Sequence, residues 1–172
     1  HLLSHGIGLK HLKIAKGELT SRAFMPIDEH GNQVSYFYWG ASAKREKMAI
    51  PKLRLGKGDI LHIAAGSPAF NRKLISANPK AFISFDPAYD ISIYSRADLE
   101  RILKKTWILF VNEHELKNAL LKFGGKSADM LLKFGPEVVV VTEGARGSGV
   151  FTKTGHFHIK AYEKAKSFDP TG

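Results

Sequence analysis

No cysteine occurs among the 172 residues of this chain. This absence excludes disulfide bridges, cysteine-ligated zinc and cysteine nucleophiles, and it fits a cytoplasmic protein. The chain also lacks the run of about 18 apolar residues that a membrane helix needs, so we expect no membrane partner. Acidic residues are scarce beside basic ones, 16 against 26, which gives a formal charge of +10. An apolar share of 44% indicates a globular protein.

The excess of positive charge has two interpretations. It can attract an anionic partner, such as a nucleotide, a phosphorylated sugar or a nucleic acid. It can also serve only solubility, as a lysine-rich surface does. The basic residues are scattered in runs no longer than three, and they do not interleave with aromatic residues as in a nucleic-acid platform. We therefore favour the solubility role and do not expect a nucleic-acid partner.

Two β-rich segments near the start of the chain, residues 20–27 and 33–39, predict a β-hairpin with a turn between them. The second segment carries four consecutive aromatic residues, from Tyr36 to Trp39. Because neighbours along a strand point to opposite faces, the aromatic rings must occupy both faces of the hairpin. Such a hairpin is either sandwiched in a core or covers something.

From residue 59 onward, short apolar segments alternate with helical ones. Near-continuous apolar strands are typical of parallel sheets covered on both faces, so we predict an α/β protein with a mainly parallel sheet and helices on both faces. Right-handed crossovers join the parallel strands. The expected strands are 59–65, 81–85, 107–111 and 137–141, the expected helices are 68–77, 96–105, 113–123 and 127–134, and a last hairpin is expected at 150–152 and 156–161.

Polar residues and glycines follow the predicted strands, at Gly66, Asp86, Asn112 and Thr142. Ligands of parallel sheets bind outside the carboxyl ends of the strands. Most of these positions also have a simple structural explanation, as a turn residue or as the N-cap of the next helix. Together they place carboxylates and an amide on one rim, which suits a magnesium–phosphate site.

The segment from Thr142 to Gly149 is the sharper signal, because it holds three glycines directly after a buried strand. Glycines leave backbone N–H groups free to approach an anion. The segment is not a Walker A loop, since no Gly-Lys-Ser/Thr ends it, and it is not a dinucleotide fingerprint, since no helix follows. A loose hairpin loop without a ligand stays open as the alternative.

Three motifs in this order resemble the PfkB (ribokinase-like) family of carbohydrate and nucleoside kinases. The family carries Asn-x-x-Glu at one strand end, Thr-x-Gly-x-x-Gly after another strand, and a later Asp-x-Thr-Gly. The matching segments are Asn112 to Glu115, Thr142 to Gly147, and Asp169-Pro170-Thr171-Gly172. The resemblance covers nearly the whole chain as the central segment of such a kinase. The stretch 32–41 looks most like the archaeal nucleoside-kinase branch.

The resemblance implies a ribokinase-like fold that transfers the γ-phosphoryl group of ATP to a primary alcohol with the help of magnesium. It implies a nucleotide-side role for four residues and a metal-side role for two, with Glu115 acting through water. The nucleotide-side residues are Asn112, Thr142, Gly144 and Gly147, and the metal-side residues are Glu115 and Asp86. Asp169, Thr171 and Gly172 would lead to an anion hole, where helix N-terminal amides stabilise the transferred group.

The resemblance also implies a β-sheet lid over the acceptor substrate. Residues 1–172 would be one incomplete α/β kinase domain, with 18–41 forming part of the lid. Phe37 and Trp39 would face the substrate, and a homodimer through the lid stays open. The aromatic strand favours a nucleoside acceptor, since a base can stack on such rings. A sugar or sugar phosphate is the nearest alternative within the family.

A hypothesis of another class is a non-catalytic fragment that binds nucleotide or nucleic acid through its charge of +10. Binding to DNA or RNA that weakens steeply with salt would favour this fragment. Binding of magnesium–ATP that is insensitive to salt would favour the kinase.

We expect the 172-residue chain by itself not to catalyse phosphoryl transfer. In PfkB kinases the catalytic base is an aspartate three residues beyond the position of Gly172, and the paired-glycine substrate motif has no counterpart after His1. The measurement is ATP-dependent phosphorylation of nucleosides and sugars by the purified chain. Measurable turnover would contradict this expectation.

Overall fold

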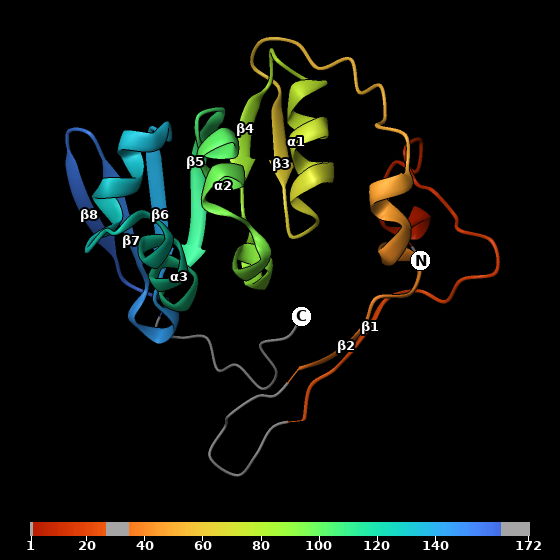
Figure 1. Cartoon of the computed structure of the whole chain (residues 1–172), viewed down its shortest axis with the longest axis horizontal. Coiled ribbons are helices and arrows are strands. Elements are labelled where there is room, and N and C mark those ends of the chain that lie inside the picture. Colours follow the sequence, from red (N-terminus) through yellow and green to blue (C-terminus); the bar gives the residue numbers. More distant parts are fainter. Residues whose placement is uncertain (1, 27–34, 163–172) are drawn as a thin grey trace. The chain divides into compact units, whose positions relative to one another are not determined.

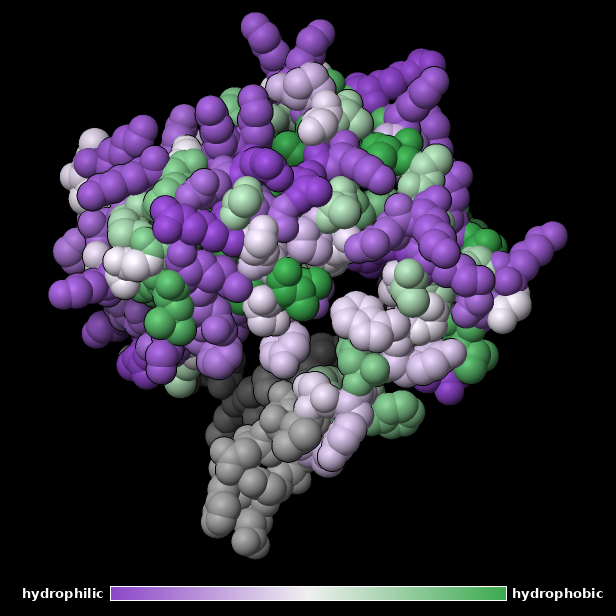
Figure 2. All heavy atoms as spheres, in the orientation of Figure 1, coloured by the Kyte–Doolittle hydropathy of each residue, from purple (hydrophilic) through white to green (hydrophobic). Residues whose placement is uncertain are grey.

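The computed structural model describes residues 2–26 and 35–162. The chain divides into two compact units, His1–Pro51 and Lys52–Gly172. None of the helices in the described ranges is both long enough and apolar enough to cross a membrane. Hydrophilic side chains cover most of the α/β unit in the view of Figure 2, and the apolar ones form small separate groups there.

The first unit contains the predicted hairpin. Strand β1 (Arg22–Phe24) pairs with β2 (Tyr36–Tyr38) in antiparallel register, with Ala23 opposite Phe37 (Figure 1). Two 3-10 helices flank the hairpin, η1 (Leu3–His5) and η2 (Gly40–Lys47). The two strands are confirmed, and the turn expected between them lies outside the described residues.

The aromatic residues of β2 occupy both faces of the hairpin, as the strand pattern requires. The rings of Phe37 and Trp39 lie on one face, with centroids 4.7 Å apart in an edge-to-face arrangement. Both side chains are about half exposed, at 50% and 49%. Gly40 follows this strand with a φ of +46°, and a Cβ there would collide with the carbonyl oxygen of Leu19. The aromatic strand therefore leads into a turn that only glycine can form.

The second unit is built on a six-stranded sheet whose strands follow the order of the sequence, β3-β4-β5-β6-β7-β8 (Figure 1). The first four strands are parallel, and β7 runs antiparallel to both β6 and β8. The bounds are β3 (Ile60–Ile63), β4 (Phe82–Phe85), β5 (Thr106–Asn112), β6 (Val138–Thr142), β7 (Ser148–Thr152) and β8 (Gly155–Ile159). The predicted mainly parallel sheet is confirmed.

Helices connect the parallel strands, and α1 and α2 begin at residues that favour a helix start. The Ser95 hydroxyl accepts a hydrogen bond from the Asp98 backbone N–H at 3.1 Å, and Pro68 occupies the first turn of α1. The α-helices are α1 (Pro68–Ser76), α2 (Arg96–Leu103) and α3 (Glu113–Phe123), and the 3-10 helices are η3 (Ala88–Ile93), η4 (Ala128–Phe134) and η5 (Gly144–Arg146). The helix expected at 127–134 is thus a 3-10 helix.

The three α-helices lie on one face of the sheet. Right-handed crossovers between strands that follow one another in a single direction place every connecting helix on the same side. The strand residues of that side are buried, among them Ile63, Phe85, Leu109, Val139 and Val141. The α/β class and the ribokinase-like fold are confirmed. The described helices cover one face of the sheet.

The 3-10 helix η4 is held by its packing on β6 and β7, and Leu131 at its centre is completely buried. We expect Leu131→Ala to lower the free energy of unfolding by about 2–5 kcal/mol, because it leaves a cavity in the core. Leu121→Ala removes the same atoms from a side chain that is 72% exposed, and it should change stability by less than about 0.5 kcal/mol. Urea unfolding measures both, and equal effects would contradict the packing.

Candidate functional site

Asn112 and Glu115 lock the junction between β5 and α3. Asn112 is the last residue of β5 and the N-cap of α3, and its side-chain oxygen accepts from the Glu115 backbone N–H at 2.9 Å. The Glu115 carboxylate accepts in return from the Asn112 backbone N–H and from its side-chain amide, both at 2.8 Å. This reciprocal capping box satisfies helix N-terminal donors and fixes both side chains.

The Glu115 carboxyl is buried, with only 8% of the residue exposed. Burial raises the pKa of Glu115 above its ordinary value, and the nearby negative charge of Asp86 raises this pKa further. The hydrogen bond from the Asn112 backbone N–H acts against this shift. The environment therefore disfavours a second negative charge beside Asp86 unless a cation is near.

Asp86 stands one residue beyond the end of β4 and accepts a hydrogen bond from the Ala88 backbone N–H at 3.0 Å. The negative charge of Asp86 acts on Glu115, so these two carboxylates and the amide of Asn112 all lie at one end of the sheet. Such oxygen groups suit Mg²⁺, which keeps several waters and needs only one or two protein carboxylates. No cluster of three or more histidine or acidic residues within the described ranges could hold a metal ion.

The glycine-bearing loop begins beside this junction. Thr142 at the end of β6 pairs with Asn112 across the parallel ladder, and η5 follows. The backbone N–H of Glu143 donates to the Gly147 carbonyl at 2.8 Å, and the N–H of Gly147 donates to the Gly144 carbonyl at 3.0 Å. The loop is therefore a closed turn with its own backbone hydrogen bonds.

The two glycines of this turn have different reasons to be glycine. Gly147 has a φ of +108°, and a Cβ there would collide with the carbonyl oxygen of Ile159. Gly144 has a φ of +59°, and no atom lies near the position of its missing Cβ. The first glycine is thus required by the packing of the turn on the end of β8. The second leaves the backbone open on one side, as an approaching ligand would need.

Two contacts between charged or polar side chains hold the turn in place, and neither was predicted from the sequence. Arg146 forms an ion pair with Glu113 in the first turn of α3, with a nitrogen–oxygen distance of 2.5 Å. The imidazole of His158 on β8 lies 3.3 Å from the Glu143 carboxylate. The sequence held one clue to these contacts, which is the position of the residues near strand ends. Residues near the ends of paired strands become neighbours in space.

His156 and His158 are both exposed residues of β8. His158 contacts Glu143, and the ring of His156 stacks on Phe151 with centroids 5.9 Å apart. Each histidine therefore has a partner of its own within the α/β unit.

Six of the predicted site residues lie at or just beyond the carboxyl ends of β4, β5 and β6: Asp86, Asn112, Glu115, Thr142, Gly144 and Gly147. Phe37 and Trp39 belong to the first unit. Asp169, Thr171 and Gly172 lie outside the described residues. The functional roles assigned to all these residues stay predictions.

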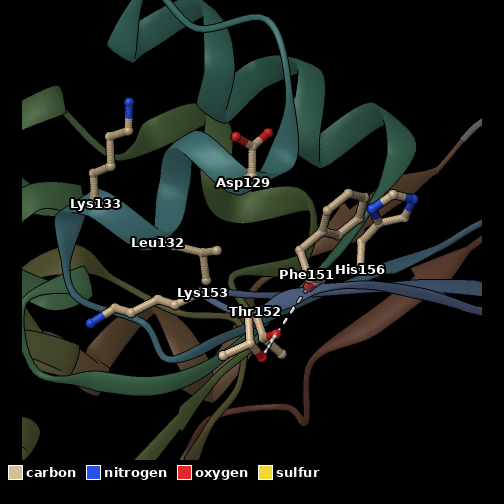
Figure 3. Close-up of a pocket in the computed structure, with 9 residues that line it drawn as sticks. Asp129, Leu132, Lys133, Phe151, Thr152, Lys153 and His156 are labelled. Atoms are coloured by element: carbon tan, nitrogen blue, oxygen red, sulfur yellow. Dashed lines mark hydrogen bonds between the residues drawn. The ribbon is translucent and has the colours of Figure 1, made fainter.

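Two pockets of the α/β unit are lined by residues other than these six. A pocket of about 760 Å³ is bounded by η4 and the β7–β8 hairpin, at the end of β6 opposite to Thr142. In Figure 3 the ammonium groups of Lys133 and Lys153 point in different directions, so the lysines do not converge on one anion. A second pocket of about 500 Å³ lies along α3, with Glu113 and Glu143 in its wall. None of the six rim residues lines either pocket.

The fold defines a class, that of α/β proteins with a mainly parallel sheet, in which ligands bind outside the carboxyl ends of the strands. The family is narrower than this class. Residues 1–172 match the family of pfkB carbohydrate kinases, and the chain belongs to this family.

Two curated relatives are nucleoside kinases. The chain is 32% identical over 173 residues to the nucleoside kinase of Methanocaldococcus jannaschii, covering 100% of this chain and 56% of that protein. It is 35% identical over 175 residues to the nucleoside kinase of Methanothermobacter thermautotrophicus, covering 99% of this chain and 55% of that protein. The chain thus spans little more than half the length of these relatives.

Solved structures show the same fold. The crystal structure of the M. jannaschii nucleoside kinase, described as an archaeal member of the ribokinase family, aligns with a TM-score of 0.88 at 31% identity. It covers 99% of this chain and 56% of that one. A nucleoside kinase of Burkholderia thailandensis in complex with inosine aligns with a TM-score of 0.86 at 19% identity, over 99% of this chain and 55% of that one. This second likeness concerns the fold alone.

The buried carboxyl of Glu115 makes the stability of the protein depend on pH. Because its pKa is raised above the ordinary 4.5 in the folded state, protonation favours folding. This contribution is fully present below the ordinary pKa and is lost as the pH rises through the raised pKa. Glu115→Gln has no carboxyl that ionises at this position, so its stability does not fall for this reason. The variant should therefore gain stability relative to the native chain as the pH rises above 4.5.

Urea unfolding from pH 4 to pH 8 measures this difference. Glu113→Gln makes the same charge change at an exposed position of the same helical turn. Comparison of the two variants distinguishes the effect of burying a carboxyl from the effect of removing a charge. Stability profiles of the native chain and Glu115→Gln that run parallel over the whole range would contradict the raised pKa.

Proposed function

We propose that this chain is part of an ATP- and Mg-dependent phosphotransferase that acts on the primary alcohol of a nucleoside. The observation that carries this proposal is the junction of Asn112 and Glu115 beside the turn that follows Thr142. Both lie at the carboxyl ends of paired parallel strands. The membership of the pfkB family and the similarity to two archaeal nucleoside kinases supply the class of reaction.

The geometry of the turn supports the proposed nucleotide-side roles. Thr142, Gly144 and Gly147 line the nucleotide, and the open backbone at Gly144 lets its phosphates approach closely. Asn112 holds the end of β5 in place beside them. Arg146 adds a positive charge to the turn and is itself held by Glu113.

The charges of Asp86 and Glu115 support the proposed metal-side roles. Asp86 and Glu115 are carboxylates whose mutual repulsion a divalent cation would relieve. A magnesium ion held near Asp86 and Glu115 would supply positive charge that stabilises the transferred phosphoryl group. Glu115 is engaged by the hydrogen bonds of the capping box, so it acts through water rather than as a direct ligand. Phosphoryl transfer needs little more from the protein than positioning and electrostatics.

A nucleoside is the acceptor that we favour over a sugar or sugar phosphate. The first unit presents Phe37 and Trp39 as exposed rings on one hairpin face. A purine or pyrimidine base stacks on such rings, whereas a sugar phosphate needs a basic cluster. Residues 18–41 then act as the lid over the acceptor, and Asp169, Thr171 and Gly172 lead to the anion hole. Association of two lids in a homodimer belongs to the same proposal.

The nucleotide side is tested by binding of magnesium–ATP to the 172-residue chain, measured by titration calorimetry. We expect Gly144→Ala to weaken binding about tenfold, a loss of about 1.4 kcal/mol, because the new methyl group meets the phosphates. Gly58→Ala is the matched control, since Gly58 also has positive φ, of +91°, and open space around it. Equal affinities of the two variants would contradict the nucleotide-side role of the turn.

The acceptor is tested with the complete kinase that contains these residues, assayed against a panel of nucleosides, hexoses and phosphorylated sugars. The expected outcome is transfer to nucleosides with a kcat/KM at least tenfold above that for any sugar. Preference for a sugar would overturn the acceptor and leave the reaction class standing. Binding to DNA or RNA with steep salt dependence and no binding of magnesium–ATP would favour the non-catalytic alternative.

A further inference from the structure

The glycine turn between β6 and β7 contains one cationic side chain, that of Arg146. Its guanidinium pairs with the Glu113 carboxylate at 2.5 Å and lies 4.0 Å from the carboxylate of Glu143. Glu113 begins α3 directly after Asn112, and Asn112 pairs with Thr142 across the ladder of β5 and β6. The ion pair therefore joins the two strand ends that carry the candidate nucleotide site.

The ion pair between Arg146 and Glu113 is open to water, since the two side chains are 64% and 58% exposed. Exposed ion pairs contribute little to stability, because water screens the charges and two long side chains lose rotational freedom. One guanidinium nitrogen, Nη2, contacts one carboxylate oxygen, Oε1. The contact thus gives Arg146 a defined place in the free protein, and another acceptor can replace it at little cost.

The carboxyl groups around Arg146 oppose an anionic ligand. Glu113 and Glu143 flank the guanidinium. Asp86 and Glu115 lie near the ends of the neighbouring strands β4 and β5. The phosphates of a nucleotide stay negative with magnesium bound, so these carboxylates repel them unless a cation turns toward them. A guanidinium binds phosphate with the same forked donors that bind a carboxylate, so phosphates would compete with Glu113 for Arg146.

The turn leaves room for such an exchange. No atom lies within 4 Å of the position of the missing Cβ of Gly144, two residues before Arg146. The backbone N–H of Arg146 donates to the Glu143 carbonyl at 3.2 Å, and the N–H of Gly147 donates to the Gly144 carbonyl at 3.0 Å. These backbone bonds keep the turn in place, so only the Arg146 side chain has to move. Exposed side chains change rotamer in picoseconds to nanoseconds.

We propose that Arg146 exchanges its ion pair with Glu113 for the phosphates of the bound nucleotide. The inference rests on the proposed function, because it requires a nucleotide beside the glycine turn. Glu113 is then a positioning residue that holds Arg146 in the free protein and competes with the ligand for it. The contrasting case is a fixed clamp between α3 and the turn, in which the ion pair persists with nucleotide bound.

The experiment uses the complete kinase that contains these residues, with binding of magnesium–ATP measured by titration calorimetry. We expect Arg146→Gln to weaken binding about tenfold, because it removes a charge-assisted contact with phosphate. The KM for magnesium–ATP should rise, and the KM for the acceptor nucleoside should not change. Arg96→Gln is the matched control, since Arg96 forms an exposed ion pair with Glu100 at 2.9 Å on α2.

Glu113→Gln should have the opposite effect. It removes the competitor for Arg146, so we expect magnesium–ATP to bind about threefold more tightly. In the Arg146→Gln background the same change should have no effect, because the competition requires both side chains. Glu100→Gln is the matched control for the loss of an exposed carboxylate. All these side chains are exposed, so the variants should fold as the native protein does, and urea unfolding checks this.

The outcomes that overturn the proposal differ in their meaning. If Glu113→Gln weakens binding as Arg146→Gln does, the ion pair is a fixed clamp. If Glu113→Gln strengthens binding equally without Arg146, it only removes a repulsive charge. If the native kinase and Arg146→Gln bind magnesium–ATP equally well, the exchange is wrong and the proposed function stands. Absence of binding by the native kinase would refute the proposed function, and the exchange with it.

Discussion

The parallel pairing of β5 with β6 is the constraint on which the candidate site depends. In this register Asn112 stands beside Thr142, so a helix cap and a glycine turn that are distant in the sequence meet at one edge of the sheet. The buried residues of both strands, such as Val111 and Val141, fix the register. A slip of one residue would turn these apolar side chains to the other face.

The capping box shows how one set of hydrogen bonds serves both folding and the candidate site. It satisfies donors at the start of α3, and it holds a carboxyl in a buried position where its pKa is raised. Asp86 reaches the same region from the neighbouring strand. The cost of gathering negative charge here is what a bound cation would offset. Under the proposed function, stability and cation binding are therefore coupled through Glu115.

Much of the fold could be predicted from the sequence, because short apolar runs and helix caps are local signals. Ser95, Pro68 and Asn112 mark helix starts where the structure has them. The segment 127–134 was harder, since its apolar pattern fits a helix and the structure forms a 3-10 helix. The ion pair of Arg146 with Glu113 was not predicted, because it depends on which strand ends are neighbours.

The sequence by itself determined the family, the α/β class and the residue types at the strand ends, because motifs and apolar periodicity are written along the chain. Only the tertiary structure decided which of these residues meet, that Glu115 is buried, and that the described helices cover a single sheet face. Strand order decides such facts, because it sets the neighbours of each strand and the side on which each crossover lies. Strand order is a property of long-range pairing, which no local pattern records.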